Sequence, residues 1–114
     1  MDDRKMMAAS TRIERGITIV EVVGQIDISS SPALRKKLLD SLKGTEHLAI
    51  NLSAVKYIDS SGIASMLEVL AAAREDQKRV VLFGLTGAVL QVLQLTRLTT
   101  VFEICETEEQ ALNA

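Results

Sequence analysis

The sequence predicts a single α/β domain with a mixed, mainly parallel β-sheet of about five strands, the first of them antiparallel, and about four helices. The chain has 114 residues, 47% of them apolar, which is enough for one hydrophobic core and hardly for two. Short β-type runs alternate with segments of helical periodicity, and strands joined by helical crossovers run parallel. Arg15-Gly16, between the first two runs, is typical of a hairpin turn, so these two strands are expected to be antiparallel.

The strands are predicted from short runs of β-branched and other apolar residues. These runs cover residues 11–14, 17–23, 47–52, 79–83 and 101–104. Residues 1–9 show no clear periodicity, and we expect them to form a flexible N-terminal segment. Residues 10–114 then make up the domain.

Two long helices are predicted between these strands. Ser31 followed by Pro32 provides an N-cap and a first-turn proline, and leucines at every fourth position continue the first helix until Gly44. The second helix ends near Asp76. Its apolar face comprises Ile63, Met66, Leu67 and Leu70.

Two shorter helices complete the pattern. Thr86 is expected to cap a third helix that is apolar around much of its circumference, which is more typical of core packing than of a patch for a partner helix. Thr107 and Gln110 form a capping box for a short final helix.

Composition argues against several classes of function. The formal net charge is −2 and the charges are interspersed, so the chain has no basic stripe for nucleic acid. One cysteine and one histidine exclude an internal disulfide and a Cys/His zinc cluster, which favours a reducing cytoplasm. The charged start does not fit a signal peptide, and no apolar run is long enough for membrane insertion.

The most informative stretch is Asp59-Ser60-Ser61-Gly62, at the start of the second predicted helix. If the second and third strands are parallel, the loops over residues 24–31 and 53–60 open at the same edge of the sheet. We therefore expect Asp27 to lie near Ser60. The carboxyl ends of strands are where ligands and partners usually bind in open α/β sheets.

Several roles fit these residues. In the simplest, Ser60 or Ser61 is an N-cap of the helix. A catalytic serine is disfavoured, because the leading glycine of a nucleophile elbow is absent and the only histidine, His47, begins its strand at the opposite edge. Asp27 and Asp59 are two carboxylates without a phosphate-binding glycine loop, a weak indication of magnesium. We expect no catalytic residue, no metal and no cofactor.

A modification site explains the doubled serine better than a cap alone. A phosphate on Ser60 would lie at the positive end of the helix, where backbone N–H groups and the macrodipole favour an anion. Its charge, added beside Asp59 and near Asp27, would oppose a partner that fits the uncharged surface. Ser29 and Ser30 are alternative phosphate acceptors, although loop and capping roles explain Ser30 equally well.

The segment from Asn51-Leu52 through Ile58-Asp59-Ser60-Ser61-Gly62-Ile63, with Gly24-Gln25-Ile26-Asp27 upstream, resembles the anti-sigma-factor antagonists of the STAS domain family. The resemblance covers nearly the whole chain and implies a STAS-like domain that is not an enzyme. It implies phosphorylation of Ser60 by a serine-kinase anti-sigma factor and dephosphorylation by a PP2C-type phosphatase. It also implies partner contacts at Asp27, Asp59, Ser60, Ser61 and Gly62.

The chain departs from the family pattern at Gln25, where glutamate is usual, and this bears on the identity of the partner. The same family includes constitutive docking subunits of stressosomes and of lipid-transport ABC complexes. The resemblance therefore predicts a phosphorylation-controlled antagonist and leaves a constitutive docking subunit as the alternative.

Overall fold

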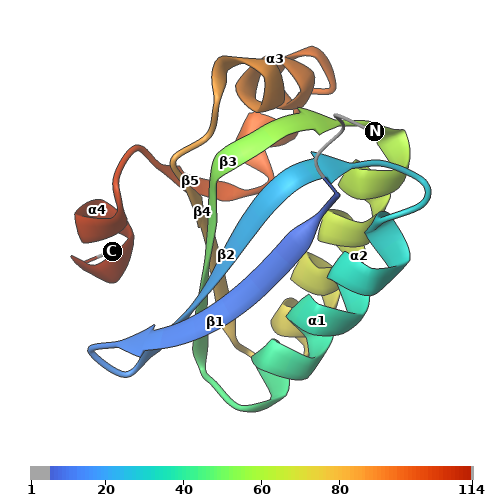
Figure 1. The fold of residues 1–114 in the computed structure, drawn as a ribbon. Coiled ribbons are helices and arrows are strands. Elements are labelled where there is room, and N and C mark those ends of the chain that lie inside the picture. The colour runs from blue at the N-terminus through green and yellow to red at the C-terminus, as the bar shows by residue number, and fades with distance from the viewer. Residues whose placement is uncertain (1–5, 114) are drawn as a thin grey trace.

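A computed structural model describes residues 6–113 of the protein and confirms the predicted fold class. Over these residues, five strands form one sheet in chain order: β1 (Ala8–Glu14), β2 (Ile17–Ile26), β3 (His47–Ile58), β4 (Arg79–Phe83) and β5 (Glu103–Cys105). β1 is antiparallel to β2, and the remaining neighbours are parallel. The sheet is therefore mixed and mainly parallel (Figure 1).

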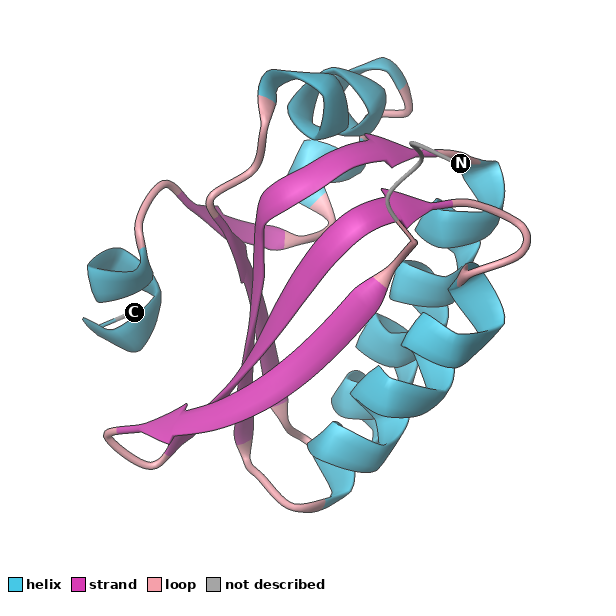
Figure 2. Ribbon diagram, viewed as in Figure 1, coloured by secondary structure: helices cyan, strands magenta, loops and turns pink. Residues whose placement is uncertain are grey.

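Four α-helices in the described part of the chain surround this sheet. They are α1 (Ser31–Lys43), α2 (Ser60–Glu75), α3 (Gly87–Leu95) and α4 (Glu108–Asn113). The helices α1 and α2 lie side by side on one face, α3 lies over one end of β3, and α4 lies on the opposite face (Figure 2). A 3₁₀ turn, Leu98–Thr100, connects α3 to β5.

The main core lies between the sheet and the pair α1/α2. The periodic leucines of α1, Leu34, Leu38 and Leu42, are all buried there, as their spacing predicts. Of the apolar third helix, only Val89 and Leu93 are buried, and Leu95 is 77% exposed. The expectation of core packing thus holds for one face of α3.

Several predicted boundaries need correction. The strands β2 and β3 continue past residues 23 and 52, because they go on pairing with each other through two register shifts to Ile26 and Ile58. The last strand is Glu103–Cys105, not 101–104, because Val101 closes the 3₁₀ turn. Ala8 and Ala9, expected in the flexible segment, pair with β2 in β1. Residues 1–5 of that segment lie outside the described residues.

Local signals at the helix starts were mostly correct. Thr86 caps α3 by accepting a hydrogen bond from the Val89 amide (3.4 Å), and the predicted Thr107/Gln110 capping box is present at α4. The prediction that Ser31 is the N-cap of α1 is wrong, because Ser31 is the first residue of the helix. The preceding Ser30 is the N-cap, and its hydroxyl bonds away from the helix.

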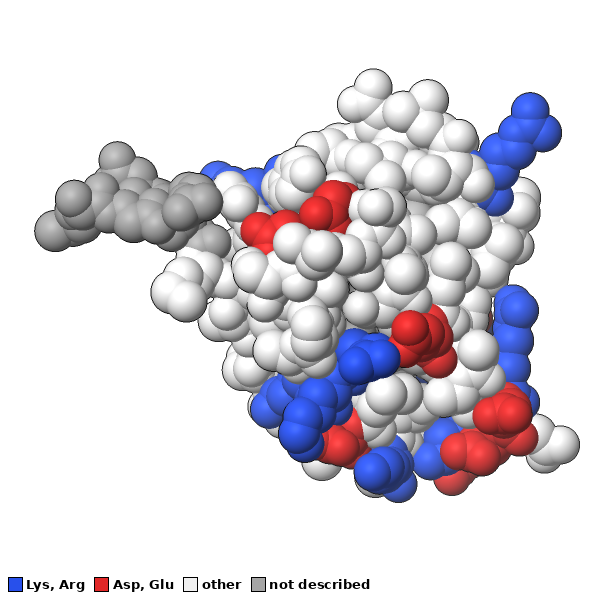
Figure 3. Space-filling view, turned by 90° about the vertical axis from the view of Figure 1, so that its right-hand side faces the viewer, with Lys and Arg blue, Asp and Glu red and all other residues white. Residues whose placement is uncertain are grey.

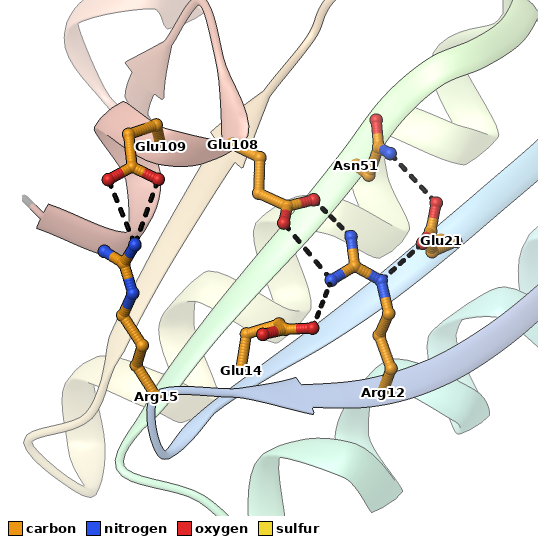
Figure 4. Close-up of polar contacts among 7 residues, drawn as sticks. All are labelled: Arg12, Glu14, Arg15, Glu21, Asn51, Glu108 and Glu109. Atoms are coloured by element: carbon orange, nitrogen blue, oxygen red, sulfur yellow. Dashed lines mark hydrogen bonds and ion pairs between the residues drawn. The ribbon is translucent and has the colours of Figure 1, made fainter.

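The short α4 is attached by arginines of the β1–β2 hairpin. Arg12 donates hydrogen bonds to Glu21 and Glu108, which raises the pKa of Arg12, and Glu21 also accepts a hydrogen bond from Asn51 (Figure 4). Arg15 forms a second link to Glu109. These contacts hold α4 over a small second core formed by Ile17, Ile19, Ala49, Val81, Phe83 and Ala111.

His47 begins β3 and lies next to Arg79, which is paired with Glu103. The His47 Nε2 atom is buried without a hydrogen-bond partner among the described residues. Burial, and then the charge of Arg79, lower the pKa of His47 below its ordinary value, while Glu103 opposes this shift. The fold therefore favours neutral His47.

The lowered pKa of His47 predicts that the free energy of unfolding depends on pH above the range in which carboxylates titrate. A histidine whose pKa is lower in the folded state takes up a proton on unfolding, so the free energy of unfolding should fall as the pH drops below about 6.5. Urea titrations between pH 7.5 and pH 5.5 measure the slope. The variant His47→Gln should have a flatter profile, and an unchanged slope in that variant would contradict the assignment.

Candidate functional site

Two aspartates end neighbouring strands at the same edge of the sheet. The register pairs Ile26 of β2 with Ile58 of β3, and Asp27 and Asp59 follow directly. The Asp59 amide donates a hydrogen bond to the Ile26 carbonyl (3.1 Å), which joins the two strand ends. The parallel pairing of β2 and β3 thus brings the two predicted acidic positions to one edge.

Asp59 is the N-cap of α2. Its Oδ1 accepts hydrogen bonds from the amides of Ser61 (3.0 Å) and Gly62 (3.2 Å) and from the Ser61 hydroxyl (2.5 Å). The Ser61 hydroxyl and both amides hold the pKa of Asp59 below its ordinary value. The proposal that Ser60 or Ser61 caps this helix is wrong, because the carboxylate already binds the amides that a serine cap would bind.

Asp27 organises the start of α1 in a similar way. Its Oδ1 accepts hydrogen bonds from the Ser29 hydroxyl (2.6 Å), the Ser29 amide (3.0 Å) and the Ser30 amide (3.1 Å). These contacts, the Ser29 hydroxyl above all, lower the pKa of Asp27. Each carboxylate is therefore ionised and engaged in closing its own turn.

The serines at this edge differ in what their hydroxyls do. Ser29 and Ser61 donate to the two aspartates, and Ser30 donates to the Gln25 carbonyl (2.9 Å). Ser31 is buried. Ser60 is exposed at the first position of α2, and no group among residues 6–113 hydrogen-bonds with its hydroxyl. Ser60 is therefore the exposed serine of this edge whose hydroxyl is not engaged by any other described residue.

Gly62 allows α2 to approach the strand ends closely. A Cβ atom there would lie 2.6 Å from Cγ2 of Ile26 and 2.7 Å from Cγ1 of Ile58, closer than real contacts. Gly62 itself is buried. It positions the start of the helix, while a direct contact between Gly62 and a partner stays a prediction.

The surface around Ser60 combines the carboxylates of Asp27 and Asp59 with exposed apolar side chains. Ile28, beside Asp27, is 79% exposed, and Ala64, one turn after Ser60, is also exposed. Figure 3 views the α1/α2 face, where Lys, Arg, Asp and Glu gather over the lower half and leave the upper half mostly uncharged. Sequence reasoning missed Ile28, although a large apolar residue within a polar loop was a usable signal.

The geometry does not support catalysis by Ser60. His47 and Ser60 lie at opposite ends of β3, so about 11 strand steps, on the order of 35 Å, separate them. No group of three or more His, Cys, Asp or Glu side chains in the described residues is arranged to hold a metal ion. In the same part of the chain, no helix is both long and apolar enough to cross a bilayer.

The protein is thus a small α/β domain with an exposed serine at the start of a helix, beside two engaged carboxylates. Comparison with known proteins identifies this domain: residues 8–111 match the STAS domain model, and the chain belongs to the STAS domain family. It is 31% identical over 88 residues to the anti-sigma-B factor antagonist of Listeria monocytogenes, covering 76% of this chain and 77% of that protein.

Two further relatives are also anti-sigma factor antagonists. The anti-sigma-B factor antagonist of Staphylococcus aureus is 26% identical over 91 residues, which cover 79% of this chain and 84% of that protein. The crystal structure of an anti-sigma factor antagonist from Mycobacterium paratuberculosis has a TM-score of 0.80 and 27% identity, covering 95% of this chain and 92% of that one. The resemblance proposed from the sequence is confirmed.

The cap at Asp59 predicts a specific pattern of stability. Asp59→Ala should lower the free energy of unfolding by about 1 kcal/mol, whereas Asp59→Asn should retain most of the cap at neutral pH. Because the folded pKa of Asp59 is lowered, its ionic contribution is present above about pH 3.8 and is lost as the pH falls through the folded value. Urea titrations of both variants test this. Equal destabilisation by Asn and Ala would contradict the cap.

Gly62→Ala tests the close approach of α2. The added methyl should force the helix start away from Ile26 and Ile58 and lower the unfolding free energy by about 1–3 kcal/mol. Ala64→Ser, an exposed change one half-turn further on, is the matched control and should be nearly neutral. Chemical denaturation of both variants measures their free energies of unfolding. An unchanged value for Gly62→Ala would show that the close approach of α2 to the strand ends is not needed for stability.

Proposed function

We propose that this protein is an anti-sigma-factor antagonist that binds a serine-kinase anti-sigma factor and is released when that kinase phosphorylates Ser60. A PP2C-type phosphatase acting on the phosphorylated form restores binding. The switch operates in the cytoplasm and involves neither nucleic acid nor membrane insertion. The observation that carries the proposal is the state of Ser60. It is exposed and makes no side-chain hydrogen bond with another of residues 6–113, whereas the hydroxyls of Ser29, Ser30 and Ser61 are engaged.

The local electrostatics support a charge-controlled interface. A phosphate on Ser60 lies at the N-terminus of the 16-residue α2, where the helix dipole favours an anion, so the fold tolerates it. Toward a partner, the same phosphate adds about −1.5 to −2 to a surface that already holds ionised Asp27 and Asp59. Phosphorylation therefore weakens binding more than it weakens the fold.

The relatives support this role over the alternative of a constitutive docking subunit. The Listeria and Staphylococcus proteins are anti-sigma-B factor antagonists, and they match this chain over most of their own length. A constitutive subunit needs no free hydroxyl at the helix start. We therefore assign partner contacts to Asp27, Asp59, Ser60 and Ser61, with Gly62 as a positioning residue.

Phosphorylation is tested by incubating the protein with its cognate serine kinase and Mg-ATP. We expect one phosphate on Ser60, located by mass spectrometry of the peptides. The variant Ser60→Ala should remain unmodified, which controls for other acceptors. Phosphate on Ser29, Ser30 or Ser61 with Ser60 unmodified would contradict the assignment.

A second prediction separates binding from stability. Ser60→Asp should weaken kinase binding by about tenfold or more through charge repulsion, with little change in melting temperature. Ser60→Ala should bind like wild type and, because this hydroxyl does not cap α2, should be as stable as wild type. Ser10→Asp, which adds the same charge on exposed β1, is the matched control. Equal affinities for all four proteins would favour the constitutive subunit.

A further inference from the structure

A groove of about 490 Å³ runs between α1 and the C-terminal half of α2, on the same face as Ser60 but towards the other end of the helices. Its apolar lining includes Leu39 and Leu42 of α1 and Ala72 of α2. Leu39 and Ala72 are only partly buried by the rest of the fold. The groove thus presents apolar surface between two helices, in the region where Figure 3 shows charged side chains gathering.

The charges that line this groove are unbalanced. Four cations, Arg35, Lys36, Lys43 and Lys78, line it together with two carboxylates, Asp40 and Asp76. The whole chain, by contrast, has a formal net charge of −2. This local excess of positive charge is complementary to an acidic ligand.

Two of the cations are available to a ligand. Lys36 and Lys43 share Asp40, at 2.9 Å and 3.7 Å, and their side chains are 78% and 80% exposed. Exposed ion pairs of this kind contribute little, so either ammonium can exchange its contact for one with a ligand. Arg35 and Lys78 are more firmly placed, by Glu68 and by the Leu42 carbonyl (2.7 Å) respectively.

The spacing of the cations indicates the kind of ligand. Arg35 and Lys43 are eight residues apart on α1, about 12 Å along the helix axis. One carboxylate reaches two neighbouring lysines here, since Asp40 contacts both Lys36 and Lys43. A peptide segment that carries several carboxylates along its length can contact all the cations of the groove and also place apolar residues on its apolar lining, as an amphipathic helix does.

We propose that the groove between α1 and α2 is a second binding site, which takes an acidic amphipathic helix of a partner protein. Apolar residues of that helix lie on Leu39 and Ala72, and its carboxylates contact Lys36 and Lys43. Ser60 takes no part in this contact. The site therefore does not depend on the phosphorylation switch, and a partner can occupy it whatever the state of Ser60.

The test uses the full chain, labelled with ¹⁵N, and a synthetic peptide of about four helical turns with leucines at i, i+4 and i+7 flanked by glutamates. We expect amide shifts around Leu39, Lys43 and Ala72. The double variant Lys36→Glu/Lys43→Glu should bind about tenfold or more weakly, and affinity should fall with added salt. Lys37→Glu is the same kind of substitution on the same helix outside the groove, with half the change in net charge, and is the control for each lysine of the pair.

Several outcomes would overturn the proposal. Equal binding of a peptide with lysines in place of the glutamates would show non-specific association, and unchanged affinity in the double variant would remove the lysines from the site. Shifts confined to the Asp27/Asp59 edge would place the peptide elsewhere. Displacement of the peptide by decanoate would show that the groove binds a small amphiphile. Dimerisation of the protein through the groove would show that it binds a second copy of this chain. Ser60→Asp should bind the peptide with the same affinity as wild type. Peptide binding therefore tests the groove independently of the proposed phosphorylation of Ser60.

Discussion

The close approach of α2 to the ends of β2 and β3 is the constraint on which the site depends. It requires a residue without a side chain at Gly62, because Ile26 and Ile58 occupy the space that a Cβ would need. With the helix start held there, the Asp59 carboxylate reaches the Ser61 and Gly62 amides, and Ser60 is left at the exposed first position. One apolar contact in the core thereby determines which serine is available at the surface.

Parallel pairing makes the two loops of the site resemble each other without making them equivalent. Both strands end in Ile-Asp, and both aspartates close a turn with serines. After Asp27, however, three residues precede the regular helix, and the hydroxyls of Ser29 and Ser30 are used within that loop. After Asp59 the helix begins at once, so Ser60 has no turn to stabilise. The difference in loop length explains why the hydroxyls of Ser29 and Ser30 are engaged and the hydroxyl of Ser60 is exposed.

The sequence predicted the order of the elements because hydrophobic periodicity and capping residues are local signals. It misassigned the cap of α2, because Asp59, Ser60 and Ser61 are all good N-caps and only the backbone geometry selects among them. It ended β2 at residue 23 because Gly24 and Gln25 interrupt the apolar run, and it ended β3 at residue 52 because the exposed Ser53 and Ala54 weaken the apolar pattern. The link between Arg12 and Glu108 joins residues far apart in the chain, and no local pattern indicates such a contact.

Helix direction explains part of the charge pattern on the α1/α2 face. Both helices follow parallel strands, so both begin at the Asp27/Asp59 edge and end at the opposite edge. Carboxylates at helix starts, and cations such as Lys43 and Arg74 in the last turns, agree with the helix dipoles. That field falls off within one turn, so it does not account for Arg35 and Lys36, which lie beyond the first turn of α1. Their position follows instead from side-chain pairing, because Arg35 joins α1 to Glu68 of α2 and Lys36 pairs with Asp40 one turn further on. Both cations also line the groove, so the same pairs that support the two helices leave positive charge beside its apolar surface.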